Sequence, residues 1–245
     1  MVEKLYITSG FGKVKAELIL NLILEMFKSR DLPTDGFTLY GDAIDLEEVA
    51  SLLKKSARHT FLLNGYGFEI HLASVARYQI DILSISTEFE TNILWDEWIT
   101  SISGQVKIIQ AWLVDADYDY WQNAEDPLQY TSQGRPWEHL AKRSNGLPPP
   151  LEKIIIDTSH NPGYRQFCMG YLVAIGSVMW LGDDFWSLVG SNKNNVVKQS
   201  WIESKEMPNG LLRIQVGNSL FSSATDGADV IQFMLRDLLF SNPGC

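Results

Sequence analysis

The sequence predicts an α+β protein in which a largely antiparallel sheet carries about four helices. Three β-prone segments, 59–64, 67–73 and 78–86, follow one another without an intervening helix, which favours an antiparallel meander over βαβ units. Helical character is found elsewhere, in segments 14–27, 46–55, 95–106 and 228–240. No internal repeat of fixed period accompanies these elements.

The elements of the first half follow from local patterns. Short β-prone runs at Leu5–Thr8 and Gly36–Tyr40 predict strands. Between them, apolar residues recur at positions 14, 18, 22 and 26, so we expect a well-buried helix. Asp45 directly precedes the next helical segment and is typical of an N-cap. Asn64-Gly65 predicts the hairpin turn inside the meander.

In the second half we expect strands at 107–114, 153–157 and 171–180, with 186–189 extending the last, and a hairpin of strands 199–205 and 211–216. We expect Asp226 to cap the final helix. The clearest linker is Asn145–Pro150. It either marks a lobe junction near 145–150 or joins two halves of one sheet. We expect one domain over residues 1–245, because neither half has an independent pattern.

The net charge is −10, from 30 acidic and 20 basic residues. Such a surface repels phosphate backbones, so we expect no nucleic-acid binding. It speeds encounter with a basic partner through long-range attraction, or it serves only solubility.

The compartment is predicted from three absences. The N-terminus lacks a secretory signal, and no uncharged stretch reaches the length of about 20 residues that a membrane span needs. Cys168 and Cys245 are unclustered, which fits a reducing compartment and disfavours a structural bridge between them. We therefore expect a cytoplasmic protein with no membrane association.

The sequence also lacks the usual signatures of catalysis. The four histidines have no metal-ligand spacing, no CxxC is present, and no GxSxG elbow occurs. We interpret Asp157–Gly163 as a polar turn leaving a strand and Asp183-Asp184 as part of a β-turn. We expect no catalytic residues, no bound metal and no cofactor.

The acidic segment 115–126 can be interpreted in three ways. Asp115, Asp117 and Asp119 match the first, third and fifth positions of a calcium loop, but Tyr120 occupies the sixth, where a glycine is needed. The run is therefore a solvated loop, the site of a metal-dependent enzyme, or an acidic and aromatic interaction patch. The patch is the prediction we carry forward, with Trp121 and Trp137 as candidate exposed anchors. Its predicted partner-binding residues are Asp115, Asp117, Asp119, Tyr120, Trp121, Glu125 and Asp126.

Several features together resemble a known family over nearly the whole chain. They are the Leu5–Thr8 strand, a tryptophan-rich middle, the segment Asp157–Tyr164 and the segment Met179–Trp186. The chain resembles bacterial immunity proteins that protect against type VI secreted toxins, and most of all immunity protein family fifty-two. Members of that family accompany toxins with a restriction-endonuclease-like domain, as in the TseT–TsiT pair.

This resemblance implies an α+β protein without catalytic activity. It would bind a cognate nuclease toxin in the cytoplasm and block the toxin's active site or its assembly. Nucleases carry basic surfaces because their substrate is polyanionic, so an acidic inhibitor competes with that substrate. We expect a monomer. The alternatives that stay open are a metal-dependent enzyme using the Asp115, Asp117 and Asp119 cluster, and a non-catalytic adaptor of a secretion assembly.

Overall fold

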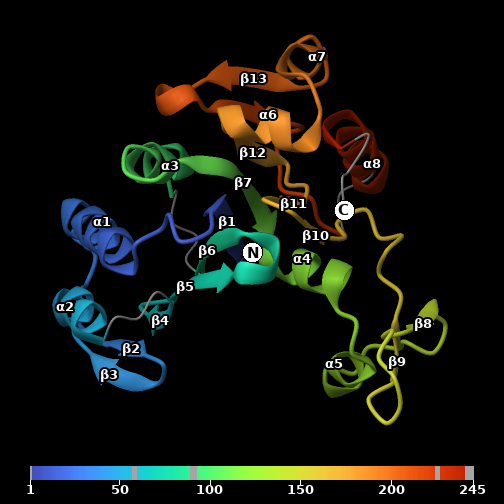
Figure 1. Ribbon diagram of the computed structural model, residues 1–245, viewed down its shortest axis with the longest axis horizontal. Coiled ribbons are helices and arrows are strands. Elements are labelled where there is room, and N and C mark those ends of the chain that lie inside the picture. Colours follow the sequence, from blue (N-terminus) through green and yellow to red (C-terminus); the bar gives the residue numbers. More distant parts are fainter. Residues whose placement is uncertain (1, 57–59, 89–92, 224–226, 241–245) are drawn as a thin grey trace.

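The computed structural model describes residues 2–56, 60–88, 93–223 and 227–240. In this part of the chain ten strands form one sheet, in the order β13-β14-β12-β7-β1-β6-β5-β4-β2-β3 (Figure 1). All of its strand pairs are antiparallel, which confirms the predicted sheet. The strands are β1 (Glu3–Gly10), β2 (Phe37–Leu39), β3 (Asp42–Ile44), β4 (Phe61–Gly65), β5 (Phe68–Val75), β6 (Ile80–Thr87), β7 (Ile108–Asp115), β12 (Val178–Leu181), β13 (Glu203–Glu206) and β14 (Leu212–Gln215).

The middle strands are covered on both faces. In β7, Ala111 and Leu113 pack into the hydrophobic core on one face, whereas Trp112 and Val114 pack into the core on the other. A strand that is buried on both sides needs apolar residues at nearly every position. The almost unbroken apolar run of β7 is therefore a consequence of its central place in the sheet.

Three helices cover one face of the sheet. They are α1 (Ala16–Ser29), α2 (Leu46–Ser56) and α3 (Trp95–Ser103), seen on the left of Figure 1. Helix α1 buries Ile19, Ile23 and Phe27, which recur every four residues along one side. Asp45 lies directly before α2, and its Oδ1 accepts the N–H of Glu47 at 3.2 Å. These three helices were predicted from the sequence.

The other face is covered by a second group of elements. These are α6 (Asp183–Val189), α7 (Lys193–Val197), α8 (Ala228–Leu239) and a small sheet of β10 (Gln166–Cys168) and β11 (Tyr171–Val173). The predicted strand 171–180 is in fact two strands in different sheets. Between them lies Gly176, where an added Cβ would be 2.6 Å from the backbone oxygen of Leu113. The predicted strand extension at 186–189 is wrong, because the chain turns at Gly182 and continues as α6.

A separate group of elements extends from the carboxyl end of β7. It comprises α4 (Ala116–Asn123), α5 (Pro127–Ser132), β8 (Lys142–Ser144) and β9 (Ile154–Ile156), and we call it the arm (Figure 1, lower right). Strands β8 and β9 pair with each other, so the predicted linker Asn145–Pro150 is the connection of a hairpin. Trp121 and Trp137 pack around a small core in the arm and are only half-exposed, which weakens their prediction as exposed anchors.

The described residues contain eight α-helices, compared with the four that were predicted. The additional ones, α4 to α7, are 8, 6, 7 and 5 residues long. Helices of two turns or fewer are too short for a periodic apolar pattern to emerge. Two predicted features, His59 and the Asp226 cap, lie outside the described residues.

Cys168 is disulfide-bonded, which corrects the expectation of unpaired thiols. Cysteine usage therefore no longer supports a reducing compartment.

None of the helices in residues 2–56, 60–88, 93–223 and 227–240 has the length and apolarity that crossing a bilayer requires.

Candidate functional site

The acidic run begins a helix. Asp115 is the N-cap of α4, and its Oδ1 accepts the N–H of Tyr118 at 2.9 Å. Asp117 and Asp119 follow in the first turn, where carboxylates interact favourably with the positive end of the helix dipole. The interpretation of this run as a solvated loop is therefore wrong. The same residues that suggested a calcium loop are those that start a helix.

The carboxylates of Asp117 and Asp119 point to different partners. Two residues apart on a helix means opposite sides of it. Asp117 is exposed and accepts the indole N–H of Trp121 at 3.0 Å, while Arg135 lies 3.4 Å from it. Asp119 is only 6% exposed and accepts the hydroxyl of Tyr6 at 3.1 Å. Within the described part of the chain, no group of three or more acidic, histidine or cysteine side chains could hold a metal ion.

Asp119, Tyr6 and Arg165 form a buried cluster. The Arg165 guanidinium lies 3.5 Å from Asp119 Oδ2 and also 4.9 Å from the centre of the Tyr6 ring. Burial raises the pKa of the Tyr6 hydroxyl, so this group stays a hydrogen-bond donor at neutral pH. Burial also raises the pKa of Asp119, against the opposing effect of the Arg165 charge. Asp119 thus has a structural role that its place in the acidic run did not reveal.

The remaining predicted residues divide between exposed and structural positions. Tyr120 is 43% exposed and meets Trp121 edge-on, with 4.9 Å between ring centres. Trp121 lies beneath the Arg135 guanidinium at 4.2 Å and against Tyr130 at 4.8 Å. It therefore joins α4 to α5 and is less available to a partner than Tyr120.

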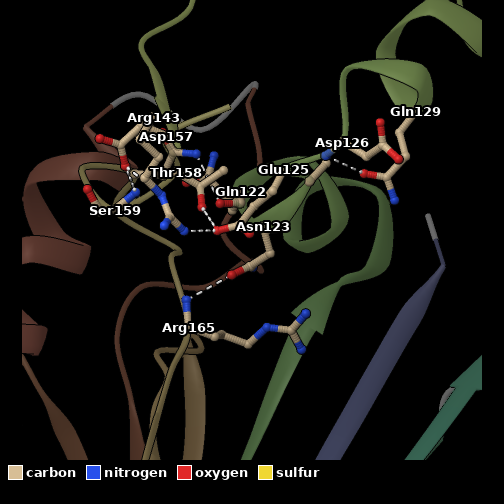
Figure 2. A network of polar contacts seen from close by, with 12 residues as sticks. Gln122, Asn123, Glu125, Asp126, Gln129, Arg143, Asp157, Thr158, Ser159 and Arg165 are labelled. Carbon is tan, nitrogen blue, oxygen red and sulfur yellow. Dashed lines mark hydrogen bonds and ion pairs between the residues drawn. The ribbon is translucent and has the colours of Figure 1, made fainter. Parts of the chain in front are cut away.

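Glu125 and Asp126 hold the arm together (Figure 2). Glu125 accepts a hydrogen bond from Arg143 Nη2 at 2.6 Å and lies 3.4 Å from the hydroxyl of Thr158. Asp126 is the N-cap of α5 and forms a capping box with Gln129. Asp126 remains exposed, whereas the carboxylate of Glu125 is committed to its two partners.

A network between α4 and segment 157–165 was not predicted. Asn123 Oδ1 accepts the backbone N–H of Arg165 at 2.8 Å, and Gln122 Oε1 accepts that of Gly163 at 3.0 Å (Figure 2). Asp157 accepts the N–H of Ser159 at 3.1 Å, in agreement with the predicted polar turn. The partners in the network are about forty positions apart, so no local sequence pattern signals it.

Acidic residues from segment 115–119 and from β5 line a cleft of about 620 Å³ between α4 and the strands β1, β5 and β6. We call it the acidic cleft. Its charged residues are four carboxylates against two cations, a formal balance of −2. Its lining residues are Val2, Lys4, Tyr6, Glu69, Ser86, Asp115, Ala116, Asp117, Asp119, Tyr120 and Arg165. Four of the seven predicted partner-binding residues are thus brought together here: Asp115, Asp117, Asp119 and Tyr120.

A second cleft, of about 760 Å³, also reaches Tyr6 and Arg165. We call it the arginine cleft, because its charged residues are three arginines and Glu125, a formal balance of +2. It is lined by Tyr6, Arg77, Tyr78, Ile82, Trp112, Asn123, Glu125, Arg143, Tyr164, Arg165, Gln166, Phe167 and Leu172. The buried Tyr6, Asp119 and Arg165 cluster therefore contributes residues to two clefts of opposite charge.

Comparison with known proteins bears on the fold. No protein-family model matches the chain, and no curated protein matches it. Among solved structures, the chain is similar to the Pseudomonas aeruginosa T6SS protein PA0821, where T6SS denotes a type VI secretion system, with a TM-score of 0.51 and 10% sequence identity. The match covers 100% of this chain and 75% of that chain. The similarity establishes a shared overall fold.

Proposed function

We propose that this chain is an immunity protein that binds and neutralises a cognate toxin of a type VI secretion system. The observation that carries the proposal is the acidic cleft. It combines exposed carboxylates with the half-exposed ring of Tyr120, in a chain whose net charge is −10. The fold shared with a type VI secretion protein supports the biological setting.

The chemistry of the cleft favours a basic partner. A lysine or arginine of the toxin would meet Asp117 and Glu69, which are exposed at the side-chain level by 76% and 47%. Tyr120 would supply the apolar contact, since tyrosine is enriched among the residues that contribute most to binding energy. A toxin that acts on nucleic acid carries such a basic surface, because its substrate is polyanionic. The acidic cleft would then occupy the surface that the substrate needs.

The proposal does not require the cytoplasmic location expected from the sequence. Cys168 is disulfide-bonded, and structural disulfides are typical of oxidising compartments. Binding at the acidic cleft depends on its charge and shape, which are the same in either compartment.

The test is co-purification of the chain with the toxin encoded beside its gene. We expect a complex of fixed stoichiometry that survives gel filtration at micromolar concentration, and loss of toxin activity in the complex. Replacement of the exposed ring by Tyr120→Ala should weaken the complex at least tenfold in Kd, as measured by calorimetry. Leu52→Ala is the matched control, because Leu52 is 46% exposed and lies on α2, outside the acidic cleft.

Absence of a complex at micromolar concentration would refute toxin binding. A complex that Tyr120→Ala and Leu52→Ala weaken equally would refute the assignment of the acidic cleft. Self-association or binding of several unrelated secretion components would favour an adaptor instead.

A further inference from the structure

The arginine cleft has no role in the proposed function, and its charge is opposite to that of the whole chain. Arg77, Arg143 and Arg165 line it, with Glu125 as the one acidic residue among its lining residues. The lining residues are therefore positive in a chain whose net charge is −10, although Asp157 and Asp119 pair with Arg143 and Arg165 from outside the lining. Screening at physiological salt has a length of about 8 Å, so a small ligand inside the cleft responds mainly to the nearby arginines.

Two of these arginines are held in place by carboxylates but keep unused donors. Arg143 donates from Nη2 to Glu125 at 2.6 Å, and its Nε lies 3.6 Å from Asp157. That Nε is buried and has no hydrogen-bond acceptor among the residues that the structure describes. Arg165 contacts Asp119 through Nη2 at 3.5 Å. A guanidinium has five N–H donors, so both side chains can still donate to an anion.

Arg77 is exposed at the edge of the cleft. It lies on the 3₁₀ turn η1 (Ala76–Tyr78), with its guanidinium 5.4 Å from the centre of the Tyr78 ring. In the described residues it has no carboxylate within 4 Å. Its charge is therefore available to a ligand without the loss of an existing ion pair.

Flat aromatic surfaces accompany the arginines. Tyr78 and Phe167 are stacked with 5.1 Å between ring centres and an interplanar angle of 23°. Tyr6 and Trp112 are stacked at 5.0 Å and 15°. Phe167 is 39% exposed, so part of its ring remains free to contact a ligand. Aromatic faces of this kind bind planar rings, including nucleic-acid bases, by stacking.

We propose that the arginine cleft binds a small organic anion that carries a planar ring, of the mononucleotide class. The arginines would hold the phosphate, because the planar guanidinium matches phosphate oxygens with two parallel hydrogen bonds. The exposed part of Phe167 would stack on the base. The cleft volume of about 760 Å³ lies within the range of about 300–1,000 Å³ that is usual for small-molecule sites.

A longer nucleic acid would not bind in the same way. A polyanion extends beyond the cleft and meets the acidic surface of the chain, including the neighbouring acidic cleft. A mononucleotide carries its charge on one phosphate and remains inside the positive region. The proposal is independent of toxin binding, since the residues that it assigns to the ligand lie outside the acidic cleft except for Arg165.

The experiment is calorimetric titration of the full chain with five probes. AMP and UMP carry both the ring and the phosphate, adenosine carries the ring alone, inorganic phosphate carries the anion alone, and indole-3-acetate is an aromatic carboxylate. We expect AMP or UMP to bind with a Kd below about 1 mM, and adenosine and phosphate to bind at least about tenfold more weakly. Absence of AMP and UMP binding at that concentration would overturn the proposal, and so would binding of indole-3-acetate alone.

Two variants locate the site. Arg77→Ala and Phe167→Ala change exposed side chains, so the fold should be retained, which circular dichroism checks. Each substitution should raise the Kd of AMP or UMP, whichever binds, by about tenfold or more. Arg30→Ala is the control, because it removes the same charge from the end of α1, where Arg30 pairs with Glu97. Wild-type affinity in the Arg77 and Phe167 variants, or an equal loss in the Arg30 variant, would overturn the assignment.

Discussion

The acidic cleft and the arginine cleft share Tyr6 and Arg165, yet their charged residues sum to −2 and +2. Their other charged residues differ: Asp119 lines only the acidic cleft, whereas Arg77 and Arg143 line only the arginine cleft. Arg165, which both clefts share, contacts Asp119 between them. The net charge of −10 is a sum over the chain and says nothing about such a division. Opposite charges can therefore serve different ligands a few residues apart.

The largest expected effect concerns the contact that divides the two clefts. Asp119→Ala leaves Arg165 and the Tyr6 hydroxyl without their buried acceptor. Removing one member of a buried ion pair costs about 3–5 kcal/mol, and we expect about 3 kcal/mol here because Arg165 retains some exposure to water. The free energy of unfolding, measured with urea, checks this value.

Asp117→Ala is the matched control for that measurement. Asp117 lies two residues away on the same helix, and its side chain is 76% exposed. Surface ion pairs contribute about 0–1 kcal/mol, so we expect a loss within that range. Equal losses in the two variants would mean that the Asp119 cluster does not have the structural role assigned to it.

A smaller loss of stability should distinguish two arginines of the arm, Arg143 and Arg135. Arg143 joins Glu125 on the α4–α5 connection to Asp157 after β9, and its hydrogen bond to Glu125 is charge-assisted. We expect Arg143→Ala to lower the free energy of unfolding by about 2 kcal/mol. Arg135→Ala removes an exposed contact with Asp117 and Trp121 and should cost about 0.5–1 kcal/mol. Limited proteolysis should also cleave the β8–β9 connection faster in the Arg143 variant alone.

The charge of the acidic cleft is tested by the rate of toxin association. Glu69→Lys reverses an exposed charge in the cleft, and we expect it to slow association by about tenfold at low salt, because steering of a basic partner is lost. Glu47→Lys is the control, since Glu47 is also exposed and paired with a lysine but lies on α2. Stopped-flow rates at two salt concentrations distinguish them. If the two variants slow association equally, the effect belongs to the net charge and not to the cleft.

The smallest effect is a pH dependence of opposite sign at two carboxylates. Burial raises the pKa of Asp119, so the folded state binds the proton more tightly than the unfolded state does. Its contribution to stability therefore grows as the pH falls from the raised pKa towards the ordinary value of 3.8. Hydrogen bonds from Ser159 lower the pKa of Asp157. The contribution of Asp157 is present above 3.8 and is lost as the pH falls through its lowered pKa.

Urea unfolding of the wild type, Asp119→Asn and Asp157→Asn between neutral and acidic pH measures both contributions. The stability of the wild type relative to Asp119→Asn should rise on acidification, and its stability relative to Asp157→Asn should fall. Parallel changes in the two comparisons would contradict the assigned causes.

The elements that sequence patterns predicted are the long ones. Helix α1 shows apolar residues at regular helical spacing over four turns, and β4, β5 and β6 form the predicted antiparallel meander. The predicted turn position was wrong, because Asn64 and Gly65 pair with β5 and the turn is formed by Tyr66 and Gly67, both at positive φ. Helices α4 to α7 escaped prediction because one or two turns hold too few apolar residues to reveal a period. In Asp115–Asp126 the acidic residues were noticed for their charge, whereas Asp115 and Asp126 are helix caps.

Within the candidate site the sequence identified residues but not their partners. Asp117 and Tyr120 are exposed in the acidic cleft, as a binding patch needs. Asp119 and Glu125 are acidic residues of the same segment, but their carboxylates form ion pairs with Arg165 and Arg143. The difference depends on which side of α4 faces the sheet and where segment 157–165 returns, and neither is a local property.

The sequence by itself determined the antiparallel meander, the three helices on the first face of the sheet and the acidic character of the chain, because these depend on residue type and on short-range periodicity. Only the tertiary structure decided that the charges divide into an acidic cleft and an arginine cleft. That division comes from contacts between residues far apart in the chain, such as Tyr6, Asp119 and Arg165. Positive and negative surfaces form only when the folded backbone brings such residues together. Burial then determines which charged side chains remain available to a ligand.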